Sequence, residues 1–372
     1  MNQQSNPALT LFDLLARNWK LPSAVRRVSF NDDNSLLAAV SDDGAVAFAR
    51  MADNEPPESR ISTDEGRAAI MPRQGKPTPL IRTRINGANS IYAFSGGGFL
   101  VAGEGDVAHL SRSGETLGTV LSPGVRLAAF DLCRETGAMA FTADRRLTIH
   151  PEGNVADKIE ADHPGRGSPT RVAFSSDGTM LAAASSDCLA LYRCRNGLEL
   201  FLQAPLGGEP LSLTWDADGR WLALGVEGAG LLLVGVEAAE HVFLGDFPGQ
   251  VADLSWCSLE QAFVASGAFR IAAWSMRSPP FQDHSKGALT TGRTGMALVE
   301  AVAVQPTGRL VAAGYGNGQV VICSVGAPDE LIVRSVGGPV TSLQWTSDGQ
   351  HLGLGDALGN VAIVSFPAQM FK

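Results

Sequence analysis

One unit of sequence returns along almost the whole of this 372-residue chain. Each copy has an apolar segment that closes on a large residue, a polar turn, a segment rich in Ala and Gly, a second turn and a third apolar segment. The clearest copies are 171–192, 211–236 and 340–366. Short strands that recur at a period of roughly 40 residues, with no helical segment between them, indicate a β-propeller.

The large residue that closes the first strand of each unit allows the blades to be counted. Eight positions fit: Phe30, Phe94, Phe130, Phe174, Trp215, Trp256, Val304 and Trp345. Six of the seven intervals between them lie between 36 and 48 residues, and the first is 64. We therefore expect one closed all-β propeller of four-stranded antiparallel blades over residues 25–372. The count favours eight blades; seven is the alternative, because Phe94 and Phe130 mark the weakest units.

The long first interval locates an insertion. Residues 51–76 are rich in Pro, Glu, Ser and Gly and show no strand periodicity. We expect them to form a loop between the third and fourth strands of the first blade, and to be a candidate for ordering on a partner. A smaller insertion of similar composition covers 277–294.

The last unit needs a fourth strand. Its third strand is expected at 360–366, and without a fourth strand the ring would keep an exposed edge. Residues 1–24 precede the first unit, and within them the segment 9–19 is a candidate for this outer strand, which would close the ring. The alternative is a short amphipathic helix, because Leu11, Leu14 and Leu15 are at helical spacing.

The turns of the repeat carry a family signature. First turns include 175–178 (SSDG), 216–219 (DADG) and 346–349 (TSDG), and second turns include 42–44 (DDG) and 317–318 (NG). Gly takes a positive φ without a steric cost and Asp bonds nearby backbone N–H groups, so hairpin formation explains these residues. With these turns, roughly residues 25–366 resemble WD40 repeats. The resemblance implies a non-enzymatic scaffold that docks protein partners on its loop faces.

The units also depart from the family. None has Gly-His before its first strand, and none ends its third strand in Trp-Asp; Trp274-Ser275 is nearest. We therefore expect the buried His–Asp hydrogen-bond network of the family to be absent.

Composition excludes several classes of partner. The net charge of −9 lacks the basic footprint of a nucleic-acid binder. The N-terminal sequence has no signal-peptide pattern, and no apolar run approaches the ~20 residues that span a bilayer. An odd five Cys at irregular spacing predicts a reduced, cytoplasmic protein. Positive charge comes mostly from Arg, as in proteins of GC-rich bacterial genomes.

The sequence contains no metal, cofactor or nucleophile motif with the residue spacing that such a site requires. Cys188 and Cys194 are six residues apart on one expected strand, hence roughly 20 Å apart, and cannot share a zinc ion. The six His are scattered singly. The Gly-rich segment 314–318 opens a strand, unlike a dinucleotide fingerprint, which opens a helix. We predict no catalytic residue, cofactor or metal.

Charged residues near the starts of the inner strands form a candidate partner-binding rim at the channel mouth: Arg26, Arg27, Arg126, Arg171, Asp253 and Glu300. Two alternatives to a scaffold stay open. A small-ligand binder or enzyme would need Asp253, Glu300 and two of the arginines to converge within hydrogen-bonding reach. A metal-handling accessory protein would need clustered Cys and His.

Overall fold

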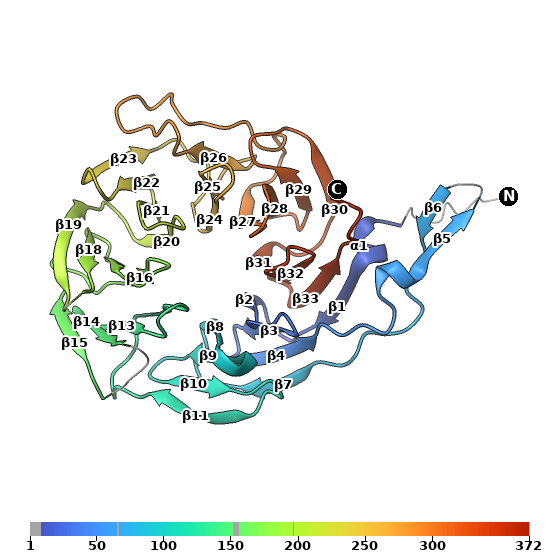
Figure 1. Cartoon of the computed structure of the whole chain (residues 1–372), viewed down its shortest axis with the longest axis horizontal. Helices are drawn as coiled ribbons and strands as arrows, with labels where there is room; N and C mark the ends of the chain where they lie inside the picture. Colours follow the sequence, from blue (N-terminus) through green and yellow to red (C-terminus); the bar gives the residue numbers. More distant parts are fainter. Residues whose placement is uncertain (1–8, 65–66, 152–155, 196, 372) are drawn as a thin grey trace.

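Eight sheets stand around a central opening and form a closed ring (Figure 1). The computed structural model describes residues 9–64, 67–151, 156–195 and 197–371. In each blade the first strand lies innermost and the chain runs outward. The prediction of an eight-bladed propeller is confirmed.

The first four blades each contain four antiparallel strands. Blade 1 consists of β2 (Val25–Phe30), β3 (Leu36–Ser41), β4 (Ala45–Arg50) and β7 (Ile81–Arg84). Blade 2 consists of β8 (Ser90–Phe94), β9 (Gly98–Ala102), β10 (Val107–Leu110) and β11 (Thr116–Leu121), with the 3-10 helix η2 (Ser95–Gly97) in its first turn. Blade 3 consists of β12 (Ala129–Leu132), β13 (Met139–Ala143), β14 (Arg146–His150) and β15 (Ile159–Asp162). Blade 4 consists of β16 (Arg171–Phe174), β17 (Met180–Ala184), β18 (Cys188–Arg193) and β19 (Glu199–Pro205).

The other four blades continue the ring to its closure. Blade 5 consists of β20 (Pro210–Trp215), β21 (Trp221–Val226), β22 (Gly230–Gly235) and β23 (Glu240–Leu244). Blade 6 consists of β24 (Leu254–Cys257), β25 (Ala262–Ala265) and β26 (Ala272–Ser275). Blade 7 consists of β27 (Val299–Val304), β28 (Leu310–Tyr315), β29 (Val320–Ser324) and β30 (Glu330–Arg334). Blade 8 consists of β31 (Val340–Trp345), β32 (His351–Asp356), β33 (Asn360–Ser365) and, from the start of the chain, β1 (Ala16–Lys20).

Blade 6 departs from the predicted four strands, because its described residues form only three. The place of the fourth is taken by the insertion 277–294, which meets β26 at an isolated bridge between Trp274 and Ala288. The Leu289 N–H donates to the Ala273 carbonyl (2.9 Å), and the Ser275 N–H donates to the Gly287 carbonyl (2.7 Å). Pro279 and Pro280 lie in this insertion and have no N–H to donate to a ladder, which disfavours a regular strand there.

The N-terminal segment closes the ring, as predicted. Strand β1 pairs antiparallel with β33, from Ala16 opposite Val364 to Lys20 opposite Asn360. Burial alternates along β1, with the side chains of Arg17 and Trp19 turned inward, so the period is that of a strand. The alternative helix is also present, as α1 (Leu11–Leu15), and it begins at a capping box formed by Thr10 and Asp13.

The insertion in blade 1 lies between β4 and β7, as predicted, but it is more than a loop. It contains the 3-10 helix η1 (Pro57–Arg60) and a hairpin of β5 (Ile61–Asp64) and β6 (Arg67–Ile70), which projects away from the ring (Figure 1). The Arg60 guanidinium donates to the Leu14 carbonyl (2.7 Å) and the Arg17 guanidinium donates to the Arg50 carbonyl (2.8 Å). The first bond ties the insertion to α1, and further bonds from Arg17 to the carbonyls of Met51 and Ala52 (both 3.0 Å) tie its start to the closure strand. Composition alone cannot reveal these long-range bonds.

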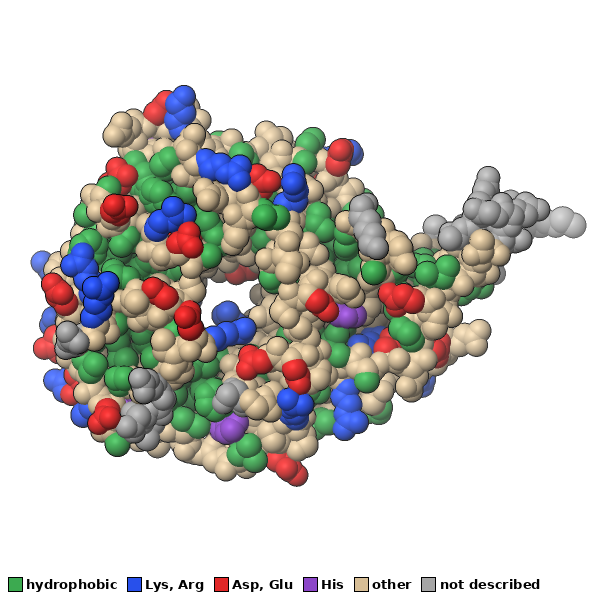
Figure 2. Space-filling view, in the orientation of Figure 1, with side chains coloured by type: hydrophobic (Ala, Val, Ile, Leu, Met, Phe, Trp, Pro, Cys, Tyr) green, Lys and Arg blue, Asp and Glu red, His purple; other side chains and the backbone are tan. Residues whose placement is uncertain are grey.

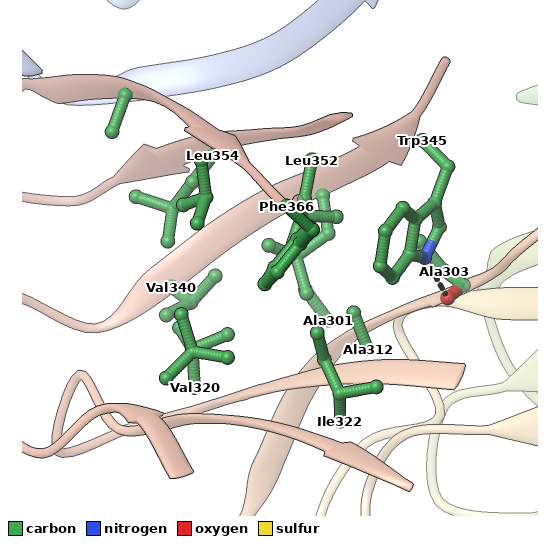
Figure 3. Packing of buried hydrophobic residues seen from close by; sticks show 14 of the residues in the cluster. Ala301, Ala303, Ala312, Val320, Ile322, Val340, Trp345, Leu352, Leu354 and Phe366 are labelled. Carbon is green, nitrogen blue, oxygen red and sulfur yellow. Dashed lines mark hydrogen bonds between the residues drawn. The ribbon is translucent and has the colours of Figure 1, made fainter. Parts of the chain in front are cut away.

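Facing blades are joined by apolar clusters. Between blades 7 and 8 the indole N–H of Trp345 donates to the Ala303 carbonyl (3.0 Å), while Leu352 and Phe366 pack nearby (Figure 3). Trp215 makes the same bond to Ala173 between blades 4 and 5 (3.0 Å). Small Ala side chains in the facing strands let the sheets approach closely while the Trp ring fills the remaining space.

One of the counted positions is wrong by two residues. Leu132 pairs with Met139 across the first turn of blade 3, as Phe174 pairs with Leu181 in blade 4. Leu132 therefore closes its strand, and Phe130 lies one pleat earlier. Phe130 has the larger side chain, which is why the sequence pattern points to it. Pairing across the first turn shows which residues of different blades are equivalent, and it identifies Leu132.

Candidate functional site

The innermost strands present one free edge to the channel, and side chains from the neighbouring blade satisfy its N–H groups. The N–H groups of Val28 and Phe30 donate to Ser342 Oγ (3.1 Å) and Gln344 Oε1 (2.6 Å). The Val304 N–H donates to Ser255 Oγ in the same way (3.0 Å). Because an unpaired buried N–H is costly, these bonds tie successive blades together at the channel.

Two of the six predicted rim residues are acids on inner strands or just before them. Asp253 Oδ2 accepts the Val302 N–H of the next blade (2.9 Å), and Oδ1 accepts the Leu254 N–H (3.1 Å). Desolvation raises the pKa of Asp253 to about 6. Glu300 is half-buried, and desolvation raises its pKa as well. Asp253 thus serves as an inter-blade acceptor.

The four predicted arginines lie in different surroundings. Arg26 forms an exposed ion pair with Asp42. Arg171 donates to the Leu211 carbonyl through Nε (3.0 Å) and to the Thr170 carbonyl (2.8 Å), and desolvation lowers its pKa. Arg126 is exposed. Arg27 lies near enough to Asp253 for its positive charge to act on that carboxyl.

The structure brings Arg27, Arg171 and Asp253 to one channel, where Figure 2 shows basic and acidic side chains at the opening. Among the described residues, no ion pair joins any two of the six predicted positions.

Sequence reasoning missed two channel residues. Asp131 Oδ2 accepts the Phe174 N–H of the next blade (2.8 Å), and the Tyr92 hydroxyl donates to the Phe130 carbonyl (2.6 Å). Desolvation raises the pKa of Asp131 to about 6. A signal was available for Asp131, because a polar residue just before the closing residue of the strand recurs at Ser255 and Gln344.

Asp131→Asn is expected to keep the bond to Phe174 and to remove a poorly solvated charge. The pKa of folded Asp131, about 6, lies above the ~3.9 of an unfolded chain, so the folded protein binds the proton more tightly. Wild-type stability should then fall as the pH rises from about 4 to about 6 and level off above, whereas the Asn variant lacks this loss. Urea unfolding at pH 4.5 and pH 7.5 measures the difference, with the exposed Asp218→Asn as control. A difference from wild type that is the same at both pH values would contradict the prediction.

A buried polar network occupies blade 4. His163 Nε2 lies 3.1 Å from Ser185 Oγ, and the Ser185 hydroxyl donates to Asp187 Oδ1 (2.7 Å). Since Ser185 donates to the acid, the imidazole is the donor to Ser185, which is the reverse of a serine activated by a histidine base. Burial lowers the pKa of His163, while bonds from the Arg166 N–H and the Ser185 hydroxyl lower that of Asp187 to about 2. This network therefore has a structural role.

The described residues give little support for metal binding, a membrane-spanning helix or a ligand site in a groove. In the described part of the chain, no group of three or more His, Cys, Asp or Glu side chains could hold a metal ion. No helix there is long and apolar enough to cross a bilayer. A groove of about 770 Å³ opens between blades 2 and 3, and four of its charged side chains pair with one another: Lys158 lies 3.4 Å from Glu160, and Arg146 lies 3.9 Å from Asp162.

One end of the ring carries exposed apolar side chains over blades 6 to 8. We call them the apolar sector: Phe269, Met296, Val336 and Leu358, which are 42%, 98%, 76% and 58% exposed. All four lie in loops between the second and third strands or between successive blades. In an antiparallel blade both kinds of loop emerge at the same end, so these four residues share one face.

Backbone bonds connect the loops of the apolar sector. The Gly295 N–H donates to the Phe269 carbonyl (2.7 Å), which sets Met296 beside blade 6. The Gly316 N–H donates to the Leu298 carbonyl (2.9 Å), and the Gly337 N–H donates to the Asn317 carbonyl (3.2 Å). The loops that carry the apolar sector therefore adjoin one another across three blades, and exposed apolar side chains gathered on one face are a candidate interaction site.

Comparison with known proteins identifies the repeat. The family described as WD domain, G-beta repeat matches residues 17–48 and 160–191. A chain from the crystal structure of the mitotic checkpoint complex matches with a TM-score of 0.55 and 13% identity, over 73% of this chain and 88% of that chain. The WD40 domain of Pan2 from Neurospora crassa matches with a TM-score of 0.56 and 11% identity, over 96% and 97%. This chain is an eight-bladed β-propeller with WD40 repeats at two positions. Curated protein sequences give no significant match.

The blade 4 network corrects one prediction about this WD40 propeller. We expected the His–Asp network of the family to be absent because Gly-His is missing, but His163, Ser185 and Asp187 form it within the matched segment 160–191. The residue before His163 is Asp162 instead of Gly. The network depends on where the imidazole lies, and it forms here without a Gly before the His. At 11–13% identity, the solved structures show a shared fold and nothing about partners.

Proposed function

We propose that this WD40 propeller is a non-enzymatic scaffold that docks a protein partner on the apolar sector. The exposure of Phe269, Met296, Val336 and Leu358 on one face is the observation that carries the proposal. Covering these side chains would remove apolar surface from water, at roughly 25 cal/mol per Å² buried. A rigid ring holds the four loops in place before the partner arrives, so little ordering opposes binding.

The proposal extends to the kind of partner and the compartment. A net charge of −9 argues for protein partners over nucleic acid or an anionic membrane. All five cysteines are free thiols, which suits a reducing cytoplasm. The predicted rim residues Arg27 and Arg171 would then border the channel beside the docking face, and the charged channel itself takes no part in catalysis.

The test replaces the apolar sector without disturbing the core. A variant with Phe269→Ser, Met296→Ser, Val336→Ser and Leu358→Ser should keep the wild-type unfolding midpoint, since all four side chains are exposed. The control variant, Leu200→Ser with Leu259→Ser, removes exposed apolar residues elsewhere on the ring. Affinity purification from cells of the source organism should recover a stoichiometric protein with the wild type and the control, and at least ten times less with the sector variant. Equal recovery from all three forms would overturn the proposal.

A further inference from the structure

The surroundings of the apolar sector are asymmetric in charge. Its own loops, at 266–270, 295–298, 316–319, 335–339 and 357–359, contain no Asp or Glu. Toward blade 5 the same face carries three exposed carboxylates, which we call the blade 5 acids: Glu209, Glu227 and Asp246. Apolar surface thus ends at an acidic edge on that side.

Hydrogen bonds join the loops that carry the blade 5 acids to one another and to the loop of Phe269. The Glu227 N–H donates to the Glu209 carbonyl (2.9 Å), and the Gln250 side chain donates to Glu227 Oε1 (3.3 Å). The neighbouring Gly249 N–H donates to the Gly267 carbonyl (2.9 Å). Gly267 precedes Phe269 by two residues in the same loop, so the acidic edge continues directly into the apolar sector.

These acids are not neutralised by ion pairs within the described part of the chain. Glu209 lies near enough to Arg171 to interact with its charge, but no ion pair involves Glu209, Glu227 or Asp246. On the other flank, in blade 1, Asp42 pairs with Arg26 and Asp43 pairs with Arg84 (2.9 Å). The face therefore offers exposed, unpaired carboxylates beside the apolar sector at blade 5, whereas the two acids of blade 1 are paired and Glu300 of blade 7 is half-buried.

We infer that the docked partner is a protein segment whose apolar anchors are followed, on one side, by Lys or Arg. This inference rests on the proposed docking function. The apolar anchors would cover the apolar sector, and the basic residues would lie over the blade 5 acids. Complementary charge at the edge of an apolar contact fixes the direction of the bound segment and speeds association. The same acidic edge repels an anionic lipid surface, which favours a protein occupant.

The test uses synthetic 15-residue peptides of defined composition. The peptides carry Leu, Ile, Phe or Met either at i, i+3 and i+4 spacing or at alternate positions. They differ in the residues on one flank, which are Lys/Arg, Asp/Glu or Ser. The full-length protein is applied to the array at low and at high salt. Basic-flanked peptides should dominate the bound set by about tenfold, and the excess should disappear at high salt, since surface electrostatics is screened.

Variants separate charge from apolar contact. Glu227→Gln with Asp246→Asn should weaken binding of basic-flanked peptides about tenfold and leave Ser-flanked peptides unchanged. The control, Glu199→Gln with Glu237→Gln, removes two acids from blades 4 and 5 elsewhere on the ring and should have no effect. Met296→Ser with Val336→Ser should abolish binding of every class.

The outcomes distinguish the two proposals. Binding that depends on the apolar sector but shows no basic preference, or an acidic one, overturns the inference about the partner and leaves the docking function standing. Absence of any peptide binding that depends on the apolar sector overturns the inference too, and together with equal recovery in the affinity purification it overturns the docking function. Binding to vesicles of phosphatidylcholine and phosphatidylserine that is lost in the Met296→Ser, Val336→Ser variant would favour a membrane as the occupant instead.

Discussion

Arg17→Ala is expected to lower the free energy of unfolding by about 3 kcal/mol, because hydrogen bonds from a buried charged group contribute ~1.5–3 kcal/mol each and their loss leaves buried acceptors unpaired. The guanidinium donates to three successive carbonyls, those of Arg50 (2.8 Å), Met51 (3.0 Å) and Ala52 (3.0 Å). It also lies 3.6 Å from Asp53. Arg17 belongs to the closure strand and all of its partners to the end of β4 and the insertion, so the variant loosens the point where the ring closes.

Urea unfolding measures the loss, and hydrogen exchange locates it. Exchange should quicken in β1 and β33, while β20 to β22, on the far side of the ring, should change only through the global loss of stability. Arg26→Ala is the matched control: its ion pair with Asp42 is exposed, and such pairs contribute ~0–1 kcal/mol. Unchanged exchange at β1 in the Arg17 variant would show that the closure strand is held by its ladder with β33 alone.

Arg334→Ala is expected to destabilise the protein by about 3–5 kcal/mol, the usual cost of stranding a buried charge. Arg334 Nη1 lies 3.2 Å from Asp356 Oδ2 inside the boundary between blades 7 and 8, and both side chains are buried. The guanidinium also donates to the Gly318 carbonyl (2.7 Å) and to the Gly338 carbonyl (3.0 Å). Those two glycines lie in loops of the docking face, so the same variant should reduce partner capture.

A double variant isolates the stranded charge. Arg334→Met with Asp356→Asn removes both charges, and Asn can still accept from the Leu358 N–H, which Asp356 Oδ1 accepts now (3.0 Å). It should recover at least half of the stability lost in Arg334→Ala. If Arg334→Ala costs less than about 1 kcal/mol, or the double variant is worse than the single one, the buried charge is not the reason that Arg334 matters.

Local sequence patterns predict much of the fold. The strand–turn repeat predicted eight blades, and the place of the insertion followed from one long interval. The closure strand followed from the need to cover an open edge, and the leucines at helical spacing correctly indicated the short helix beside it. These predictions succeeded because hairpin turns and strand alternation are determined by residues close together in the sequence.

The misses share another cause. Phe130 was chosen over Leu132 because side-chain size is visible in the sequence and pairing across a turn is not. The missing Gly-His pair wrongly predicts that the family network is absent, because the contact of His163 with Ser185 spans 22 residues. The insertion was expected to be a loop because its anchors, Arg17 and Leu14, lie in a segment about 40 residues earlier.

The sequence by itself determined the repeating unit, the count of eight blades and the position of most turns, since these depend on neighbouring residues. Only the tertiary structure decided what the charged rim and the loops do. Asp253 has a bonding partner because blade 7 lies beside blade 6, and Phe269, Met296, Val336 and Leu358 share a face because closure of the ring aligns the strand directions of three blades. Contacts across blade boundaries join residues about 40 positions apart, or 314 positions where blade 8 meets blade 1, beyond the range over which local preferences act.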